Sequence, residues 1–139
     1  MSSALWIPHY KAGLTNAAAN TLFEVAMAAD GDLWEGVLEF TIVVKTAAAH
    51  QTIAGVARAS ASRLPVAAYS VPAPPHTVQH KHLTSGTFTL DGFTITAGAS
   101  KVTVNLDTTT GTSLGAPTLY AVRLNIRPML VGRLPITLL

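Results

Sequence analysis

Alternating apolar and polar residues predict β-strands along most of this chain. The clearest alternation spans 36–46, where one set of positions holds Leu38, Phe40, Ile42 and Val44 and the other holds Glu39, Thr41, Val43 and Lys45. Because successive side chains of a strand point to opposite faces, we expect the first set in a core and the second at solvent or a partner. The ranges 101–106 and 117–126 alternate in the same way, and 22–28 is a weaker strand candidate.

Turn residues between these stretches predict hairpins. Asp91-Gly92 separates 87–90 from 93–96, which is the pattern of a two-residue hairpin with an Asp-Gly corner. The range 51–58 also alternates, so we expect it to pair with 36–46 through a turn near 46–50. The alanine-rich stretch up to Arg63 is open to a second interpretation, a short helix, because alanine favours helices.

Prolines and glycines divide the remainder of the chain. Residues 1–20 are expected to form an irregular arm, docked on its own domain or crossing to a neighbouring subunit. The range 71–75 is a proline-rich connector, and 108–115 is a threonine- and glycine-rich loop. Pro128 and Pro135 restrict the tail, 128–139, to an arm or an edge strand.

The predicted fold is all-β, an antiparallel sandwich or jelly roll of about seven or eight short strands over 21–127, with extended arms at both ends. A chain of 139 residues is the usual size of one domain. The inner faces are expected to be formed by Leu38, Phe40, Ile42, Val44, Phe88, Leu90, Phe93, Ile95, Val102, Val104, Val122, Leu124 and Ile126.

The chain carries little charge for a free monomer. Charged residues make up 12% of the sequence while 49% of it is apolar, and the formal net charge is +2. This composition favours a protein that is packed against neighbours, although alanine-rich surfaces also occur in ordinary domains. The residues expected at such contacts are Trp6, Ile7, Tyr10, Leu14, Trp34, Met129 and Leu130, and Trp34 is alternatively a cap on the core.

Several classes of partner are not expected. The nine basic residues are scattered without a run, which argues against a nucleic-acid surface. No secretory signal and no apolar stretch long enough for a membrane helix is visible, so we expect a soluble protein without a membrane partner. Zero cysteines exclude a disulfide framework and a thiol nucleophile.

The one cluster of potential metal ligands is His76, His80 and His82. Imidazoles bind zinc, nickel or copper, and a His-x-His pair on a strand points both rings to one side. The alternative is a polar strand at a loop or interface, because no neighbouring acid completes a ligand set. Asp30-x-Asp32 lacks the later ligands of a calcium loop, and nucleophile and phosphate-loop motifs are missing. We therefore expect no cofactor and no enzymatic activity.

Three segments carry a resemblance to a known group of proteins. They are Leu22-Phe23-Glu24-Val25-Ala26, the range 36–42 with its glycine, leucine and phenylalanine, and the range 50–58 with its glutamine, glycine and valine. The segments resemble successive strands of small tailed-phage virion proteins. The likeness spans about two thirds of the chain, in order, in generic strand motifs; the prolines at 72–75 and the three histidines depart from it. It resembles head decoration, or cement, proteins and related head- or tail-fibre β-domains, which are often trimeric jelly rolls.

The resemblance implies a structural role in the virion with no catalytic residues. The first hypothesis is a homotrimeric cement protein that bridges subunits of the major capsid protein, located on the capsid surface after assembly in the host cytoplasm. The second is a fibre domain that binds a receptor or carbohydrate through loops near Trp34, 76–82 and 108–115. The third is a cupin-like metal-dependent enzyme that uses the three histidines.

Overall fold

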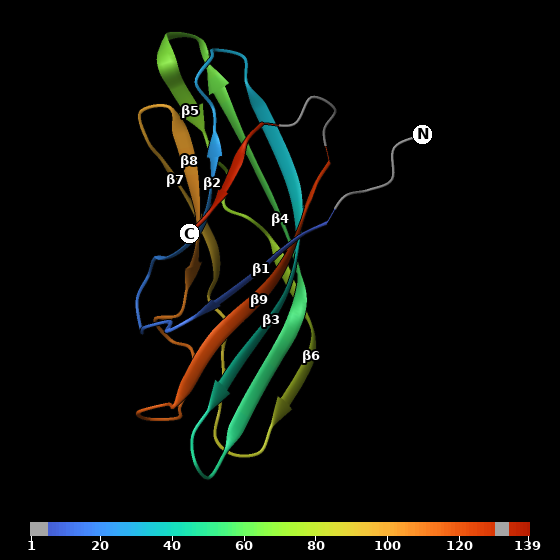
Figure 1. Ribbon diagram of the computed structural model, residues 1–139, viewed down its shortest axis with the longest axis vertical. Helices are drawn as coiled ribbons and strands as arrows, with labels where there is room; N and C mark the ends of the chain where they lie inside the picture. The colour runs from blue at the N-terminus through green and yellow to red at the C-terminus, as the bar shows by residue number, and fades with distance from the viewer. Residues whose placement is uncertain (1–5, 130–133) are drawn as a thin grey trace.

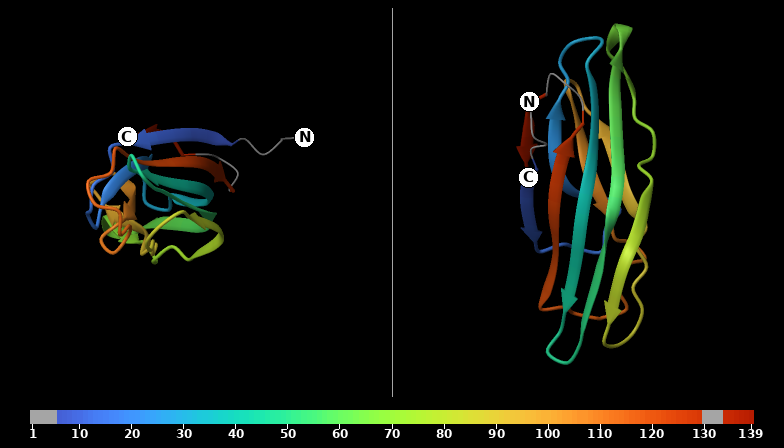
Figure 2. Two further views of the ribbon diagram at one scale, coloured as in Figure 1. Left: turned by 90° about the horizontal axis from the view of Figure 1, so that it is seen from below. Right: turned by 90° about the vertical axis from the view of Figure 1, so that its right-hand side faces the viewer.

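The hairpin predicted from the clearest alternation forms the centre of the fold. The computed structural model describes residues 6–129 and 134–139, and in it β3 (Leu33–Lys45) pairs with β4 (His50–Leu64) from Lys45↔His50 to Leu33↔Ser62. The intervening turn is closed by a hydrogen bond from the Thr46 amide to the Ala49 carbonyl, 2.8 Å. The two strands run the length of the molecule in Figure 2. The predicted pairing and its turn are confirmed.

The alternative of a helix before Arg63 is wrong. The strand β4 continues without a break to Leu64, and its alanines at 57, 59 and 61 lie buried on the inner face. Alternation therefore prevails over the helix propensity of alanine, because the small side chains make room for bulky neighbours such as Trp34, the register partner of Ala61. Only a single 3-10 turn, Pro65–Ala67, follows.

All described strands pair antiparallel in two sheets that lie face to face (Figure 1). Sheet A has the order β1-β9-β3-β4-β5, with β6 also paired to β4, and its remaining strands are β1 (Ile7–Ala12), β9 (Leu119–Pro128), β5 (Ala68–Ser70) and β6 (His76–Leu83). Sheet B has the order β10-β2-β8-β7, made of β10 (Ile136–Leu138), β2 (Asn20–Ala26), β8 (Lys101–Asp107) and β7 (Gly92–Ala97). The predicted all-β sandwich is confirmed, although β3 and β4, with 13 and 15 residues, are not short.

The core lies between the two sheets and consists largely of the predicted inner residues. All of them are buried except Ile95, which is half-buried and packs against the core. Phe40 of sheet A meets Phe93 of sheet B edge to face at 5.3 Å, and Phe23 of sheet B meets Trp34 of sheet A at 5.8 Å. Each such fully buried side chain contributes about 1.5–3 kcal/mol to stability, so these contacts hold the sheets together.

The predicted hairpin at Asp91-Gly92 is wrong. The range 87–90 does not pair with β7; the Thr89 amide instead donates to the Gly111 carbonyl at 3.0 Å, and Phe88 forms a bridge with Thr112. Strand β7 pairs with β8 through a turn at 98–100. The reason is that 87–90 packs against the loop after β8: Phe88 and Leu90 are buried in the core, and the Asp91 carboxylate accepts a bond from the Thr110 amide of the same loop.

Both ends of the described chain form edge strands. Residues 7–12, expected within an irregular arm, form β1, which pairs with β9 on its own domain. The carboxyl-terminal β10 pairs with β2, and the His9 ring nitrogen lies 3.0 Å from the Leu139 carbonyl oxygen, which links the two ends. Among residues 6–129 and 134–139, no helix is long and apolar enough to cross a membrane.

Candidate interaction surface

The outer face of sheet A spans four paired strands, β1, β9, β3 and β4. It is formed by the alternate residues that do not face the core, and we call it the sheet A face. Its members are Pro8, Tyr10 and Ala12 of β1; Leu119, Ala121, Arg123, Asn125 and Arg127 of β9; Glu35, Val37, Glu39, Thr41, Val43 and Lys45 of β3; and Thr52, Ala54, Val56 and Arg58 of β4. Small and β-branched residues predominate at its centre, so the face is shallow there.

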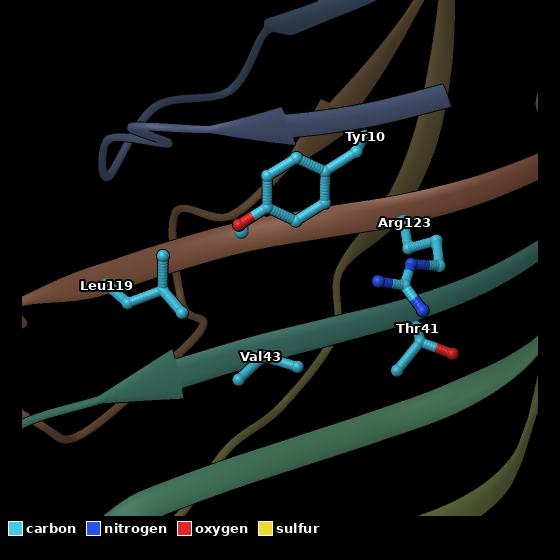
Figure 3. Close-up of a pocket in the computed structure, with 6 residues that line it drawn as sticks. Tyr10, Thr41, Val43, Leu119 and Arg123 are labelled. Atoms are coloured by element: carbon cyan, nitrogen blue, oxygen red, sulfur yellow. The ribbon is translucent and has the colours of Figure 1, made fainter. Parts of the chain in front are cut away.

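A hollow of about 280 Å³ lies on this face, lined by Tyr10, Thr41, Val43, Leu119, Ala121 and Arg123. Strand register produces it: Arg123 of β9 is the partner of Tyr10 on β1 and of Thr41 on β3. Figure 3 shows the Tyr10 ring extending across β9 towards Leu119, and the Arg123 guanidinium extending towards Thr41. An aromatic ring and a cation thus border a floor of short apolar side chains.

Two of the four cations on this face have a partner among the described residues. The Arg58 guanidinium lies 2.6 Å from Glu35, and the Arg127 guanidinium lies 5.6 Å from the centre of the Trp6 ring. The Glu39 carboxylate accepts a bond of 3.3 Å from the Asn125 amide. Within the described part of the chain, Arg123 is exposed and has no acidic side chain within 4.0 Å. The hollow therefore carries an uncompensated positive charge.

The three predicted metal ligands do not converge. His80 and His82 pair with Ala54 and Thr52 and lie at the margin of the sheet A face. A register shift in the β4–β6 pairing separates His76, which lies on the other side against Gly92, where an added Cβ would meet the ring at 2.8 Å. No group of three histidine, aspartate or glutamate side chains within the described ranges has a geometry for a metal ion.

His50 is a neighbour of the cluster that the sequence did not indicate. Its ring stacks on the ring of His82 with 5.3 Å between centroids and 2° between planes. The two histidines are 32 positions apart, so only the β4–β6 pairing brings them together. The sequence alone does not indicate that His50 and His82 are in contact, because this depends on the register between β4 and β6. The pair occupies the margin of the face next to Lys45, the register partner of His50.

The predicted contact residues divide into exposed and buried groups. Tyr10 is 55% exposed, Met129 is 42% exposed, and Trp6 is 36% exposed, whereas Ile7 is half-buried against the core. Leu14 and Trp34 are buried at 6% and 2% exposure, so neither is available at the surface. The Trp34 ring instead covers Gly36 in β3, where any Cβ would lie 2.6 Å from it. Leu130 lies outside the described residues.

The carboxylates of Asp30 and Asp91 accept hydrogen bonds from neighbouring loop residues. Partial burial raises the pKa of Asp30, but bonds from the Arg63 side chain and from the amides of Ala67 and Val66 outweigh it and hold the pKa below its usual value. Bonds from the Thr110 side chain and amide lower the pKa of Asp91. Both carboxylates therefore hold turns together, and Asp30 binds the amide of Val66 in the turn where this β-branched residue has a φ of 65°.

The fold and this surface define a two-sheet antiparallel β-sandwich domain with an open sheet face. No protein-family model and no curated protein sequence matches the chain. Among solved structures it is similar to the tailspike protein of Acinetobacter baumannii phage AM24, with a TM-score of 0.50 and 11% identity over 98% of this chain. The match spans 28% of the tailspike chain. At this level of identity the likeness is one of fold.

Proposed function

We propose that this chain is a structural β-domain of a phage particle that acts by assembling with other virion proteins and not by catalysis. The sheet A face carries this proposal, because a regular sheet surface with small apolar side chains at its centre and the exposed Tyr10 on its edge strand β1 is suited to protein contact. The fold likeness to a tailspike and the sequence resemblance to small virion proteins support the same class.

Within the particle, the tail is the position that the fold likeness favours. The neighbour is described as a tailspike protein, and 98% of this chain superposes on a part of it. A domain of a tail spike or fibre, in which the sandwich packs against other copies or other segments, is therefore the first candidate. A role in binding a receptor or carbohydrate belongs to the same candidate.

Head decoration is the second candidate. The sequence resemblance to cement proteins and the low charge of the chain favour it. In this case the sheet A face would lie on the major capsid protein, and copies would associate, as a trimer in our first hypothesis. The exposed Tyr10 and Met129 are then expected at contacts between subunits.

Localisation in purified particles tests the proposal. Antibodies raised against the folded chain, visualised with gold by electron microscopy, are expected to mark the tail, and mass spectrometry of separated heads and tails should find the chain with the tails. Recovery with empty heads would replace the first candidate by the second. Absence from particles of a phage that encodes the chain would overturn the virion role, and a strict monomer at micromolar concentration in light scattering would argue against self-assembly.

A further inference from the structure

Arg123 brings to the hollow a positive charge that has no ion pair among the described residues. Three other arginines of the described chain have partners within it: Arg58 with Glu35, Arg63 with Asp30, and Arg127 with the Trp6 ring. Arg123 has no such ion pair, although its planar guanidinium is the group best suited to a bidentate bond with a carboxylate. A partner that brings a carboxylate to this position would complete the site.

The surroundings of Arg123 define the rest of that partner. Val43, Leu119 and Ala121 form an apolar floor, and Tyr10 supplies an aromatic wall. Only the side chains of Thr41, Arg123 and Tyr10 offer hydrogen bonds in the hollow. A saccharide, with hydroxyls on every ring, would leave many of them without partners, whereas an apolar side chain next to a carboxylate matches both parts of the lining.

We propose that the hollow docks a segment of a partner protein in which an aspartate or glutamate stands beside a leucine, isoleucine or valine. Arg123 binds the carboxylate, and the apolar side chain fills the space between Tyr10 and Leu119. Tyrosine and arginine are the residues that most often dominate the binding energy of protein interfaces. Arg123 and Tyr10 are accordingly the principal contacts.

A second copy of the same face is a poorer occupant. The sheet A face carries Lys45, Arg58, Arg123 and Arg127 against Glu35 and Glu39 only. Two such faces brought together would oppose positive charges, which is unfavourable in a desolvated contact. The charge of the face therefore complements an acidic segment on a different surface.

Selection from a displayed library of random nonapeptides tests this inference, with the full-length chain as the target. Peptides that pair an acidic with a branched apolar residue should be enriched on the wild type and not on Arg123→Gln. The matched control is Arg58→Gln, which removes a cation from the same face outside the hollow and should select the same peptides as the wild type. Enrichment of other sequences, or enrichment that persists on Arg123→Gln, would overturn the proposal.

A titration with one synthetic peptide, Gly-Ser-Leu-Glu-Ile-Ser-Gly, gives the second measurement. Amide NMR shifts should move in β1 and β9 around the hollow, and affinity should fall about tenfold with Arg123→Gln, with Tyr10→Ala, or with glutamine in place of the peptide's glutamate. An oligosaccharide of glucuronic acid is titrated in the same way. If it binds at Arg123 while the peptide does not, the proposal of a protein partner is wrong.

This inference rests on the proposed assembly function, and the two can fail separately. If the chain selects acidic peptides through Arg123 but is absent from phage particles, the docking site stands and the virion role is wrong. A chain found in particles that selects no acidic peptide would do the reverse.

Discussion

The carboxylate of Asp91 accepts a hydrogen bond from the backbone amide of Thr110 at 2.8 Å, and a second carboxylate bond comes from the Thr109 hydroxyl at 3.1 Å. These bonds fasten the loop after β8 to the start of β7. We expect Asp91→Ala to lower the free energy of unfolding by about 1 kcal/mol, because the carboxylate is exposed and its bonds compete with water. Urea denaturation measures the change. Asp107→Ala, which removes a carboxylate bound only within its own turn, is the comparison and should cost less.

Acid should reproduce part of the same effect. The bonds from Thr110 hold the pKa of Asp91 below its usual value, so the folded state binds this proton less readily than the unfolded state. The stabilisation is therefore complete above the ordinary aspartate pKa, near 3.8, and is lost as the pH falls through the lower pKa of the folded state. The difference in stability between wild type and Asp91→Ala should shrink below pH 4. A constant difference down to pH 2 would show that the charge of Asp91 is not involved.

The alternation of apolar and polar residues was enough to predict the β-sandwich. Features that depend on side-chain bonds between distant parts of the chain could not be predicted from it. The alternation of β3 and β9 fixed their inner faces, since one face of each is buried along its whole length. The Asp91-Gly92 pair has a strong local hairpin signal, but the Asp91 carboxylate binds Thr110, 19 positions away, and no local pattern indicates this. The arrangement of the three histidines depends on a long-range feature in the same way: the register shift beside Gly55 places His76 apart from His80 and His82.

Gly55 makes that register shift possible. A Cβ at this position would lie 2.0 Å from the Thr77 carbonyl oxygen of β6 and 2.9 Å from the Phe40 ring. Gly55→Ala should therefore destabilise the chain by about 1–3 kcal/mol and loosen β6 from β4. Hydrogen exchange should speed up selectively in 76–83. Gly115→Ala, where a Cβ meets nothing within 4 Å, is the matched control and should have little effect. Equal losses from both variants would contradict the steric explanation.

Gln51 organises the loops at one end of the core. Its side chain is fully buried; the amide nitrogen donates to the carbonyls of Ser85 at 2.7 Å and Thr87 at 3.1 Å, and the amide oxygen accepts from the Thr112 hydroxyl. Gln51→Leu keeps the size but leaves these partners unpaired, at a cost of about 2–3 kcal/mol. Thermal unfolding should show the loss. The control Gln79→Leu lies on the exposed strand β6 and should be close to neutral.

Tyr120 offers the opposite outcome, a substitution that stabilises the chain. Its hydroxyl is buried against Gly111 and has no hydrogen-bond partner among the described residues, because the nearby Thr108 hydroxyl is already bonded to Thr15 and Asn20. Tyr120→Phe retains the ring, which packs on Phe88 at 6.3 Å, and removes an unsatisfied polar group. We expect a gain of about 0.5–1 kcal/mol in the free energy of unfolding at neutral pH.

The pH dependence of Tyr120→Phe separates this explanation from a general packing effect. Burial raises the pKa of the Tyr120 phenol, and the Asp91 carboxylate adds to the rise. The contribution of the neutral phenol is complete below the ordinary pKa of 10.0 and is lost as the pH rises through the higher pKa of the folded state. Tyr120→Phe has no phenol to ionise, so its advantage over wild type should widen above pH 10 in urea denaturation. A constant advantage for Tyr120→Phe across this pH range would mean that the hydroxyl is solvated in the folded chain.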